Sequence, residues 1–444
     1  MSLNETIYNK WKPLLEMDLP NAPKTTDPRR ARITAQILEN TEQAIREGSS
    51  FSPRTLLEAG VPPNATGSSI DNYDPVLISM VRRTMPNLMA YDVCGVQPMT
   101  GPVGLIFAMR SRYESQAGTE TFYQEVNTAF SSVTTGANTL GQKHVGTIPG
   151  TTSYTANLAE TGIYNFATGM SIAQAEALGA STNTAIPSMA FSIERQSVTA
   201  VSRALKAEYT QEIAQDLRAI HGLDAETELA NILSTEILAE INREVIRTIY
   251  VTATRGANTG TTTAGIFDLD TDSNGRWSVE KFKGLMFHIE RECNQIAKDT
   301  RRGKGNILIC SSDVASALQM AGVLDYAPAL NSNQLNVDDT GNTFVGVLNG
   351  RLRVYIDPYA SGGNYAIVGY KGANALDAGI FYCPYIPLQM VRAVGEDNFQ
   401  PRIAFKTRYG MVANPYAEGA TAGLGVLRKD SNVYYRRILI TNIL

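Results

Sequence analysis

The sequence predicts an α+β fold built around one long helix. A regular apolar stripe runs through residues 226–252, and helical and strand patterns alternate from about residue 279 onward. Between them and the N-terminal part, residues 91–190 are rich in Gly, Thr, Ser and Asn, and helical pattern is scarce there. With 444 residues, of which 43% are hydrophobic and 18% charged, the chain is long enough for two or three packed units.

Residues 1–58 form a separate region in this interpretation. Polar stretches containing proline flank a helical pattern from Arg30 to Arg46, which carries Ile33, Ile37, Leu38, Thr41 and Ile45 on one side. A single amphipathic helix cannot build a core, so we expect its apolar side to dock on another part of the protein. Residues 59–79 then turn rich in Gly, Pro and Asn, which indicates an extended arm or linker.

The long helix is predicted over residues 226–252, with Asp224 as its N-cap. At about 1.5 Å per residue this helix is roughly 40 Å long, which suits an element packed along a sheet. The expected solvated face carries Glu236, Glu240, Arg243, Glu244 and Arg247. The expected apolar face consists of Leu229, Leu233, Ile237, Ile241, Val245 and Ile249, with Ile232, Leu238 and Ile246 beside them.

The last third of the chain alternates helix with strand. Helices are predicted at residues 279–298 and 312–321. Strands are predicted at residues 306–310, 353–356, 365–370, 379–383, 402–409 and 434–440. Helices followed by a run of strands are typical of α+β domains.

Charge and cysteine usage narrow the class of protein. The net charge is −4, and the densest basic stretch, Arg301–Lys304, is too short for a dedicated nucleic-acid binder. Cys94, Cys293, Cys310 and Cys383 are widely spaced among apolar neighbours, which favours buried free thiols in a reducing cytoplasm. The sequence contains neither a signal peptide nor an apolar stretch long enough to span a membrane.

Two chemical sites are alternatives to a structural role. Asp270, Asp272, Asn274 and Gly275 match the first half of a calcium-binding loop, but Lys281 stands at the twelfth position, where the metal needs a glutamate. We therefore expect a turn leading into a helix rather than a metal site.

The histidines His144, His221 and His288 have no partner at zinc-ligand spacing, and His221 with Gly222 reads as a helix end before the next helix start. The enzyme alternative would use His221, Asp216 and Glu226 in a cleft. Phosphate-loop, dinucleotide-binding and nucleophile-elbow motifs are absent from the sequence, so we expect neither an enzyme nor a cofactor.

A series of uncommon strings, in order across nearly the whole chain, resembles the major capsid proteins of T-even-type bacteriophages. The strings are Asn9–Glu16, Met80–Leu88, Asp92–Met99, Leu205–Asp224, Glu236–Ile237, Glu240–Val245, Val354–Asp357, Val368–Gly372, Asp377–Ile380 and Phe405–Gly410.

This resemblance implies the Hong Kong 97 fold, with a long spine helix, peripheral and axial domains, an extended β loop and an N-terminal arm. The expected segments are 1–58, an N-terminal propeptide; 59–90, the N-terminal arm; 91–190, the extended β loop; 191–279, the peripheral domain with the spine helix; 280–430, the axial domain; and 431–444, a C-terminal strand that returns to the peripheral domain. The segment of residues 130–189 is shorter than the inserted accessory domain of the larger relatives, so we expect a reduced insertion.

The resemblance also implies a function and partners. We expect hexameric capsomers that form an icosahedral or prolate phage head around the DNA genome, assembled in the bacterial cytoplasm. The implied partners are copies of the chain, a vertex protein, the portal, an internal scaffold, a prohead protease and outer decoration proteins, with the packaged DNA touched only non-specifically. The alternative within the same fold is the pentameric vertex paralogue.

Family members lose their N-terminal segment to a protease that cuts after Glu in a short apolar-x-Glu pattern. Leu56-Leu57-Glu58 matches best by position, so Glu58 is the expected processing site. Glu47 and Glu39 match the same pattern and are the alternatives.

Overall fold

A computed structural model describes most of the chain outside residues 51–87 and 132–171. The described residues are 3–16, 27–50, 88–118, 120–121, 130–131, 172–176, 187–222, 224–273, 275, 277–321, 324–326, 343–357, 359–360, 363–374, 377–394, 400–418 and 425–443. They divide into two compact units. The first, which we call the body, comprises residues 1–106 and 196–444, and the second unit comprises residues 107–195.

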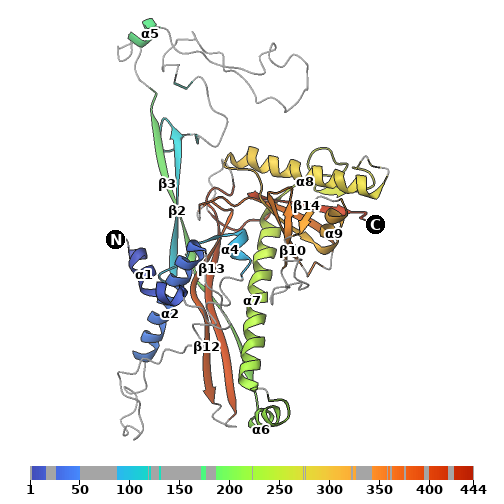
Figure 1. Ribbon diagram of the computed structural model, residues 1–444. Helices are drawn as coiled ribbons and strands as arrows, with labels where there is room; N and C mark the ends of the chain where they lie inside the picture. The colour runs from blue at the N-terminus through green and yellow to red at the C-terminus, as the bar shows by residue number, and fades with distance from the viewer. Residues whose placement is uncertain are drawn as a thin grey trace. The chain divides into compact units, whose positions relative to one another are not determined.

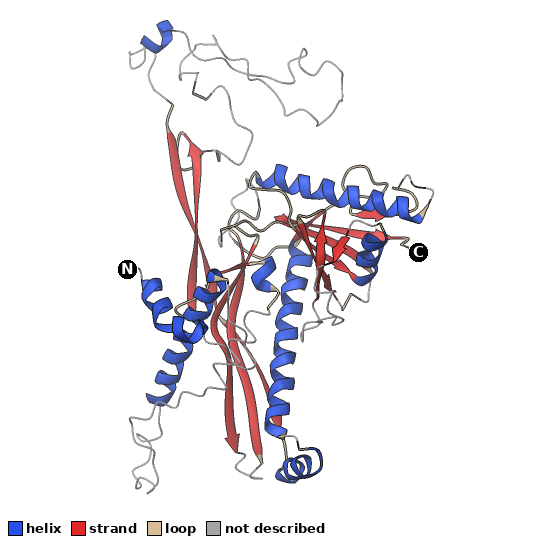
Figure 2. Ribbon diagram, in the orientation of Figure 1, coloured by secondary structure: helices blue, strands red, loops and turns tan. Residues whose placement is uncertain are grey.

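The α+β prediction is confirmed, because the body combines helices with two mixed sheets (Figures 1 and 2). The smaller sheet has the order β1-β12-β13-β4 and the larger has the order β5-β14-β11-β7-β10-β9-β8, with β6 paired to β14. The strands of the smaller sheet are β1 (Gly95–Val96), β4 (Val201–Glu208), β12 (Ile380–Val394) and β13 (Pro401–Ala413). The strands of the larger sheet are β5 (Ala253–Arg255), β6 (Ile266–Asp268), β7 (Ile307–Ser311), β8 (Leu324–Tyr326), β9 (Thr343–Leu348), β10 (Leu352–Asp357), β11 (Asn364–Gly369) and β14 (Asn432–Thr441).

The larger sheet is covered on both faces, and strand β7 shows how the sequence achieves this. All five of its residues are buried. Alternate side chains point to opposite faces of a strand. Ile307 and Ile309 accordingly join the core that includes α7 (Ala225–Thr252), whereas Leu308 and Cys310 join the core under α8 (Ser278–Thr300) and α9 (Ser312–Met320). Figure 2 shows α8 lying across this second face.

The long helix is confirmed within one residue of its predicted start. α7 buries Leu233, Ile237, Ile241, Val245 and Ile249, as the apolar stripe predicts. Asp224 stands at the N-cap, but its carboxylate accepts a hydrogen bond from the Thr227 hydroxyl (2.9 Å) rather than capping a backbone N–H.

Two details predicted for α7 are wrong. Ile232 is 62% exposed because it shares its helical row with the exposed Glu228 and Glu236. The face expected to be solvated is partly engaged, since α7 packs beside β4 and β13 of the smaller sheet. Arg203 of β4 pairs with Glu240 (2.8 Å) and Glu244 (2.6 Å) of that face.

Strand β12 is longer than the predicted residues 379–383. It continues to Val394 through Pro384 and Pro387, which lack a backbone N–H to donate to a ladder. The register with β13 shifts between Pro384 and Ile386 and again between Ile386 and Gln389. These irregularities allow the strand to contain prolines without ending there.

The N-terminal helices are α1 (Leu3–Glu16) and α2 (Pro28–Ser50), and short helices occur at α4 (Ala90–Val93), α6 (Gln211–Asp216) and the π turn η3 (Leu217–His221). The apolar side of α2 docks as expected: Ile37 and Leu38 are buried, and α2 contacts α1 and β12. Figure 1 shows α1 next to α2, which packs on β12. The second unit contains α5 (Ile172–Glu176) and parts of β2 (Val103–Tyr113) and β3 (Met189–Thr199), which pair as a ribbon.

All four cysteines are free and buried, as predicted. Burial raises the pKa of the Cys94, Cys293, Cys310 and Cys383 thiols to about 12. No helix among the described residues is long and apolar enough to cross a membrane.

Candidate functional site

The second unit presents an apolar face to solvent. Phe107 and Met109 of β2 and Phe191 and Ile193 of β3 are between 58% and 67% exposed, and they alternate with less exposed residues along each strand. A contiguous exposed apolar patch marks an interaction surface more often than scattered apolar residues do. This ribbon face is therefore the candidate binding surface of the second unit.

The ribbon's other side chains form a charge cluster that is largely shielded from water. Arg110 of β2 is fully buried and pairs with Glu120 (3.0 Å) and Glu194 of β3 (3.1 Å), and Arg112 pairs with Glu194 (3.2 Å). Burial raises the pKa of Glu120, and the neighbouring arginines oppose that shift. These ion pairs tie the two strands together and keep the arginines away from the apolar face.

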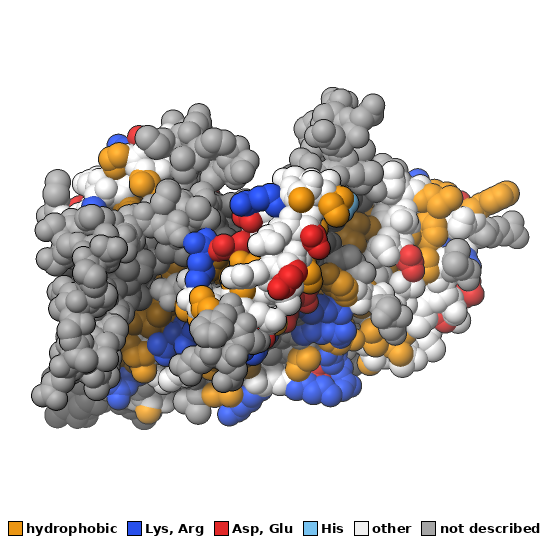
Figure 3. Space-filling view, turned by 90° about the horizontal axis from the view of Figure 1, so that it is seen from below, with side chains coloured by type: hydrophobic (Ala, Val, Ile, Leu, Met, Phe, Trp, Pro, Cys, Tyr) orange, Lys and Arg blue, Asp and Glu red, His pale blue; other side chains and the backbone are white. Residues whose placement is uncertain are grey.

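A second group of exposed apolar side chains lies in the body, on α6 and η3. Ile213 and Ile220 are exposed there, close to the charged residues Glu212 and Arg218. The view from below in Figure 3 shows hydrophobic side chains interspersed with charges of both signs. Such a mixed surface suits a contact with another protein better than a small-molecule site.

The structure does not assemble the residues of the enzyme alternative into an enclosed site. His221 and Asp216 are exposed on η3 and α6, and Glu226 forms an ion pair with Arg392. Gly222 follows in the left-handed conformation (φ 65°), which confirms that His221 and Gly222 end one helical turn before the next helix begins. His144 lies outside the described residues.

The calcium-like loop is a turn into α8 whose carboxylates are already engaged. Asp270 pairs with Lys281, the residue that stands where calcium would need a glutamate. Asp272 accepts hydrogen bonds from the Thr262 backbone and hydroxyl (both 2.8 Å) and from the Asp268 N–H (3.0 Å). Asn274 lies outside the described residues, among which no group of three metal-ligating side chains occurs.

The basic stretch Arg301–Lys304 is also engaged within the body. Arg302 pairs with Asp377 (3.1 Å) and stacks over Tyr416, and Lys304 pairs with Glu290. Because Arg302 and Lys304 already pair with carboxylates of the body, their charges are less available to bind phosphate.

The three candidate processing residues stand in different situations. Glu39 lies within α2, largely buried, where it accepts a hydrogen bond from Trp11 Nε1 (2.8 Å) and pairs with Lys10 (2.9 Å). Glu47 belongs to the last turns of α2, and its side chain lies outside the described residues. Glu58, the expected site, lies outside them entirely.

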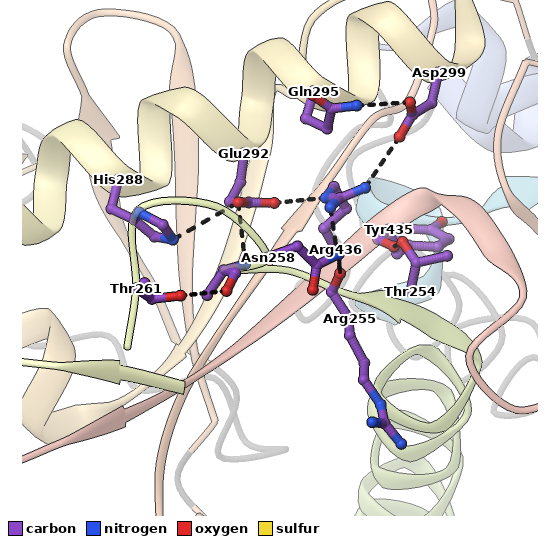
Figure 4. A network of polar contacts seen from close by, with 11 residues as sticks. Thr254, Arg255, Asn258, Thr261, His288, Glu292, Gln295, Asp299, Tyr435 and Arg436 are labelled. Carbon is purple, nitrogen blue, oxygen red and sulfur yellow. Dashed lines mark hydrogen bonds and ion pairs between the residues drawn. The ribbon is translucent and has the colours of Figure 1, made fainter. Parts of the chain in front are cut away.

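Sequence reasoning missed a buried polar network that joins α8 to β14 (Figure 4). Glu292 accepts hydrogen bonds from Arg436 Nε (2.5 Å) and from the Ala257 N–H (3.1 Å), and it lies 3.7 Å from His288 Nε2. Burial lowers the pKa of His288, with Glu292 opposing the shift. The i, i+4 spacing of His288 and Glu292 could have revealed that pair, but no sequence signal connects them to Arg436.

Comparison with known proteins identifies the family. The sequence profile described as "Major capsid protein Gp23" matches residues 70–440. The major capsid protein of Serratia phage KSP90 is 40% identical over 99% of this chain and 99% of its own length. The major capsid protein of Enterobacteria phage T4 is 34% identical over 98% of each chain.

The chain belongs to the Gp23 major capsid protein family. This confirms the family resemblance seen in the sequence and makes the chain a structural protein of the phage virion capsid.

Other proteins are similar to smaller parts of this chain or at lower sequence identity. The capsid vertex protein of Enterobacteria phage T4 is 30% identical over 53% of this chain and 55% of its own length. Among solved structures, one titled "The capsid of Myoviridae Phage XM1" is 9% identical and covers 79% of this chain and 91% of that chain, with a TM-score of 0.37. A structure from Mycobacterium phage Bobi is 10% identical and covers 88% and 97%, with a TM-score of 0.40.

Proposed function

We propose that this Gp23-family chain assembles with copies of itself into hexameric capsomers of an icosahedral or prolate head that encloses the phage DNA. The observation that carries the proposal is the apolar ribbon face of the second unit. Full burial of a large apolar side chain is worth about 1.5–3 kcal/mol relative to full exposure. Most of that free energy is not realised at the exposed side chains of this face, which are Phe107, Met109, Phe191 and Ile193. A neighbouring subunit that covers this face recovers that energy, and a closed shell repeats the contact at every subunit.

Within this proposal the chain has the Hong Kong 97 fold. α7 is the spine helix. Strand β2 of the ribbon belongs to the extended loop, residues 91–190, and β3 leads from the end of that loop into the peripheral domain. Strands β7 to β11 of the larger sheet, with α9 and nearly all of α8, fall in the expected axial domain, residues 280–430. Strands β5, β6 and β14 of the same sheet fall in segments expected for the peripheral domain. In the smaller sheet, β12 and β13 join β4. This supports the expectation that late strands return to the peripheral domain, for which residues 191–279 and 431–444 are expected.

Maturation removes residues 1–58 by a prohead protease that cuts after Glu58. The burial of Glu39 and its contacts with Trp11 and Lys10 within an intact helix disfavour the alternative cut there, because a protease needs an accessible, extended segment. Mass spectrometry of chains from finished heads tests this step. A mass that begins at residue 59 supports Glu58, and one that begins at 40 or 48 replaces it with Glu39 or Glu47.

The proposed partners are a vertex protein, the portal, an internal scaffold, the prohead protease and outer decoration proteins, met during assembly in the bacterial cytoplasm. The packaged DNA is touched only non-specifically, consistent with the net charge of −4.

Negative-stain electron microscopy of the chain co-expressed with its scaffold tests assembly. The native chain should form shells, tubes or six-fold rings. Phe191→Asp should remain folded, because the side chain is exposed, yet lose assembly. Gln116→Asp, an exposed position in the turn after β2, is the matched control and should assemble normally. Equal assembly of both variants would contradict the role of the ribbon face.

A second candidate, the pentameric vertex paralogue, is favoured by the 30% identity to the T4 vertex protein. The match covers about half of the chain, whereas the major capsid proteins of phages KSP90 and T4 match over 98% or more of it. Five-fold rings in the same micrographs would support the vertex role, and six-fold rings the major capsid role.

A further inference from the structure

The N-terminal helices form a hairpin with its own internal contacts. Trp11 and Leu15 of α1 are buried against α2, and Trp11 donates a hydrogen bond to Glu39 (2.8 Å). Lys10 pairs with Glu39 (2.9 Å) and also with Glu42. The hairpin, residues 3–16 and 27–50, is therefore held together by contacts that do not depend on the segment that follows it.

The same hairpin is seated through Asn40 on the rest of the body, residues 88–106 and 196–443. The Asn40 side-chain Nδ2 donates hydrogen bonds to the backbone carbonyls of Met99 (2.7 Å) and Tyr385 (2.9 Å), and the residue is almost fully buried. Tyr385 lies at the bulge of β12, between the paired residues Pro384 and Ile386, and has no partner residue of its own in β13. The extra residue of a bulge is left out of the regular pairing, and Asn40 donates to the part-buried carbonyl of this one.

Apolar and charged contacts extend this seat along α2. Ala35, Ile37 and Leu38 are buried in the core that also contains Tyr382 and Leu388 of β12. Near the start of α2, Arg30 pairs with Asp92 at 2.5 Å. Arg29 donates to the carbonyl of Ala373.

Clefts of about 980 and 410 Å³ lie between the hairpin and the body. The larger is lined by Tyr8 and Gln36 from the hairpin and by Gln97 and Met99 from the body. The hairpin is thus held along one continuous stripe with open space beside it. A segment seated this way can leave as a unit without breaking a strand pairing of the body.

We infer that the rest of the body carries a docking site for this helical hairpin and holds it non-covalently, so that a cut between residues 51 and 58 leaves the hairpin bound. The occupant is the chain's own residues 3–50, and Asn40 is the residue that fixes its position. The docking rests on the contacts above; its place in maturation rests on the proposed cut after Glu58. Release of the hairpin is then a step separate from cleavage. Release, and not the cut, exposes the carbonyls of Met99 and Tyr385.

The test uses the full chain with a recognition sequence for a site-specific protease in place of residues 52–57. Because the phage protease is not involved, the result is independent of whether Glu58 is the natural cut. After complete cutting, the hairpin fragment should co-elute with the body in size-exclusion chromatography. Separate elution of the fragment from a body that keeps its circular dichroism spectrum would overturn the inference.

Two variants locate the site. Asn40→Asp replaces both donated hydrogen bonds by repulsion between a carboxylate and two carbonyls, so release from the cut chain should be about ten-fold faster or more. Gln43→Glu makes the same amide-to-acid change on an exposed side chain three residues along the same helix, and release should be unchanged. Equal release of both variants would reject Asn40 as the anchor.

Hydrogen exchange provides a readout that needs no variant. In the cut native chain, the amides of residues 31–43 should stay protected as in the uncut chain. Loss of protection on cutting would overturn the inference. A two-to-two complex, detected by light scattering only after cutting, would instead show that hairpins exchange between copies and would reject the intramolecular seat.

Discussion

Glu292 of α8 and Arg436 of β14 form a buried ion pair, with 2.5 Å between Oε2 and Nε. Arg436 also pairs with Asp299 (3.0 Å), which lies seven residues after Glu292 on α8. The second carboxylate oxygen of Glu292 accepts a hydrogen bond from the Ala257 N–H (3.1 Å). The pair thus joins a helix, a strand and the loop after β5 at one point (Figure 4). Charges buried in this way are strongly coupled to their partners.

Replacing Glu292 should destabilise the body. Glu292→Gln leaves Arg436 buried with only Asp299 as a counter-charge, so we expect a loss of about 2–4 kcal/mol in the free energy of unfolding. Urea denaturation measures this loss. Glu236→Gln, on the exposed side of α7, is the control and should change stability by less than about 0.5 kcal/mol. Similar effects from both variants would show that the buried pair contributes little.

His288 should make stability depend on pH. Burial against Phe267 lowers the pKa of His288, whereas Glu292 and Asp272 oppose the shift. Because the folded pKa lies below the unfolded value of about 6.5, the unfolded chain binds the extra proton first, so stability is full above that pH and falls as pH decreases. His288→Gln should therefore lose less unfolding free energy than the native chain between pH 7.5 and 5.5. A steeper loss in the variant would reverse the assigned direction.

The sequence predicted α7 and the pairs of helices and strands after it, because each carries a periodic apolar pattern over many residues. Single positions were less predictable. Ile232 looks apolar enough for the core, but its row on α7 faces solvent with Glu236. The pairing of Arg203 with Glu240 and Glu244 depends on where β4 packs, which no local pattern encodes.

The candidate site was harder to predict than the fold. Half of the apolar ribbon face, Phe107 and Met109, lies in the Gly- and Thr-rich region 91–190, where the pattern indicates strands but not which face stays uncovered. The other half, Phe191 and Ile193, lies just after that region. The seat of the hairpin depends on Asn40 meeting a bulge of β12 that is 345 positions away in the chain. Only the three-dimensional arrangement brings that amide to the Tyr385 carbonyl.

Substitution of Gly222 should lower the stability of the protein through backbone strain alone. Gly222 adopts φ 65°, and nothing lies within 4 Å of where a Cβ would stand, so a side chain meets strain without a clash. Gly222→Ala should cost about 1 kcal/mol, whereas Gly222→Asn should cost less because Asn tolerates the left-handed region. Thermal unfolding of the two variants checks the order, and an equal cost would place the effect outside the backbone.

The cysteines should be unreactive until the body unfolds. Burial raises the pKa of each thiol to about 12, so thiolate is scarce and the reagent has no access. A thiol reagent at pH 8 should label none of the four cysteines in the native chain and all four in denaturant. Rapid labelling of one thiol in the native chain would reveal local opening around it.

A pair of identical substitutions on α7 tests the packing of the long helix. Ile241 is 3% exposed in the core beneath the helix, so Ile241→Asp buries a carboxylate among apolar side chains and should cost roughly 4–5 kcal/mol or more. Ile232→Asp makes the same change nine residues earlier, at an exposed position of the same helix, and should cost less than about 1 kcal/mol. The yield of soluble protein and its denaturation midpoint measure both. If the body tolerated Asp at 241 as well as at 232, the buried face of α7 would be wrongly assigned.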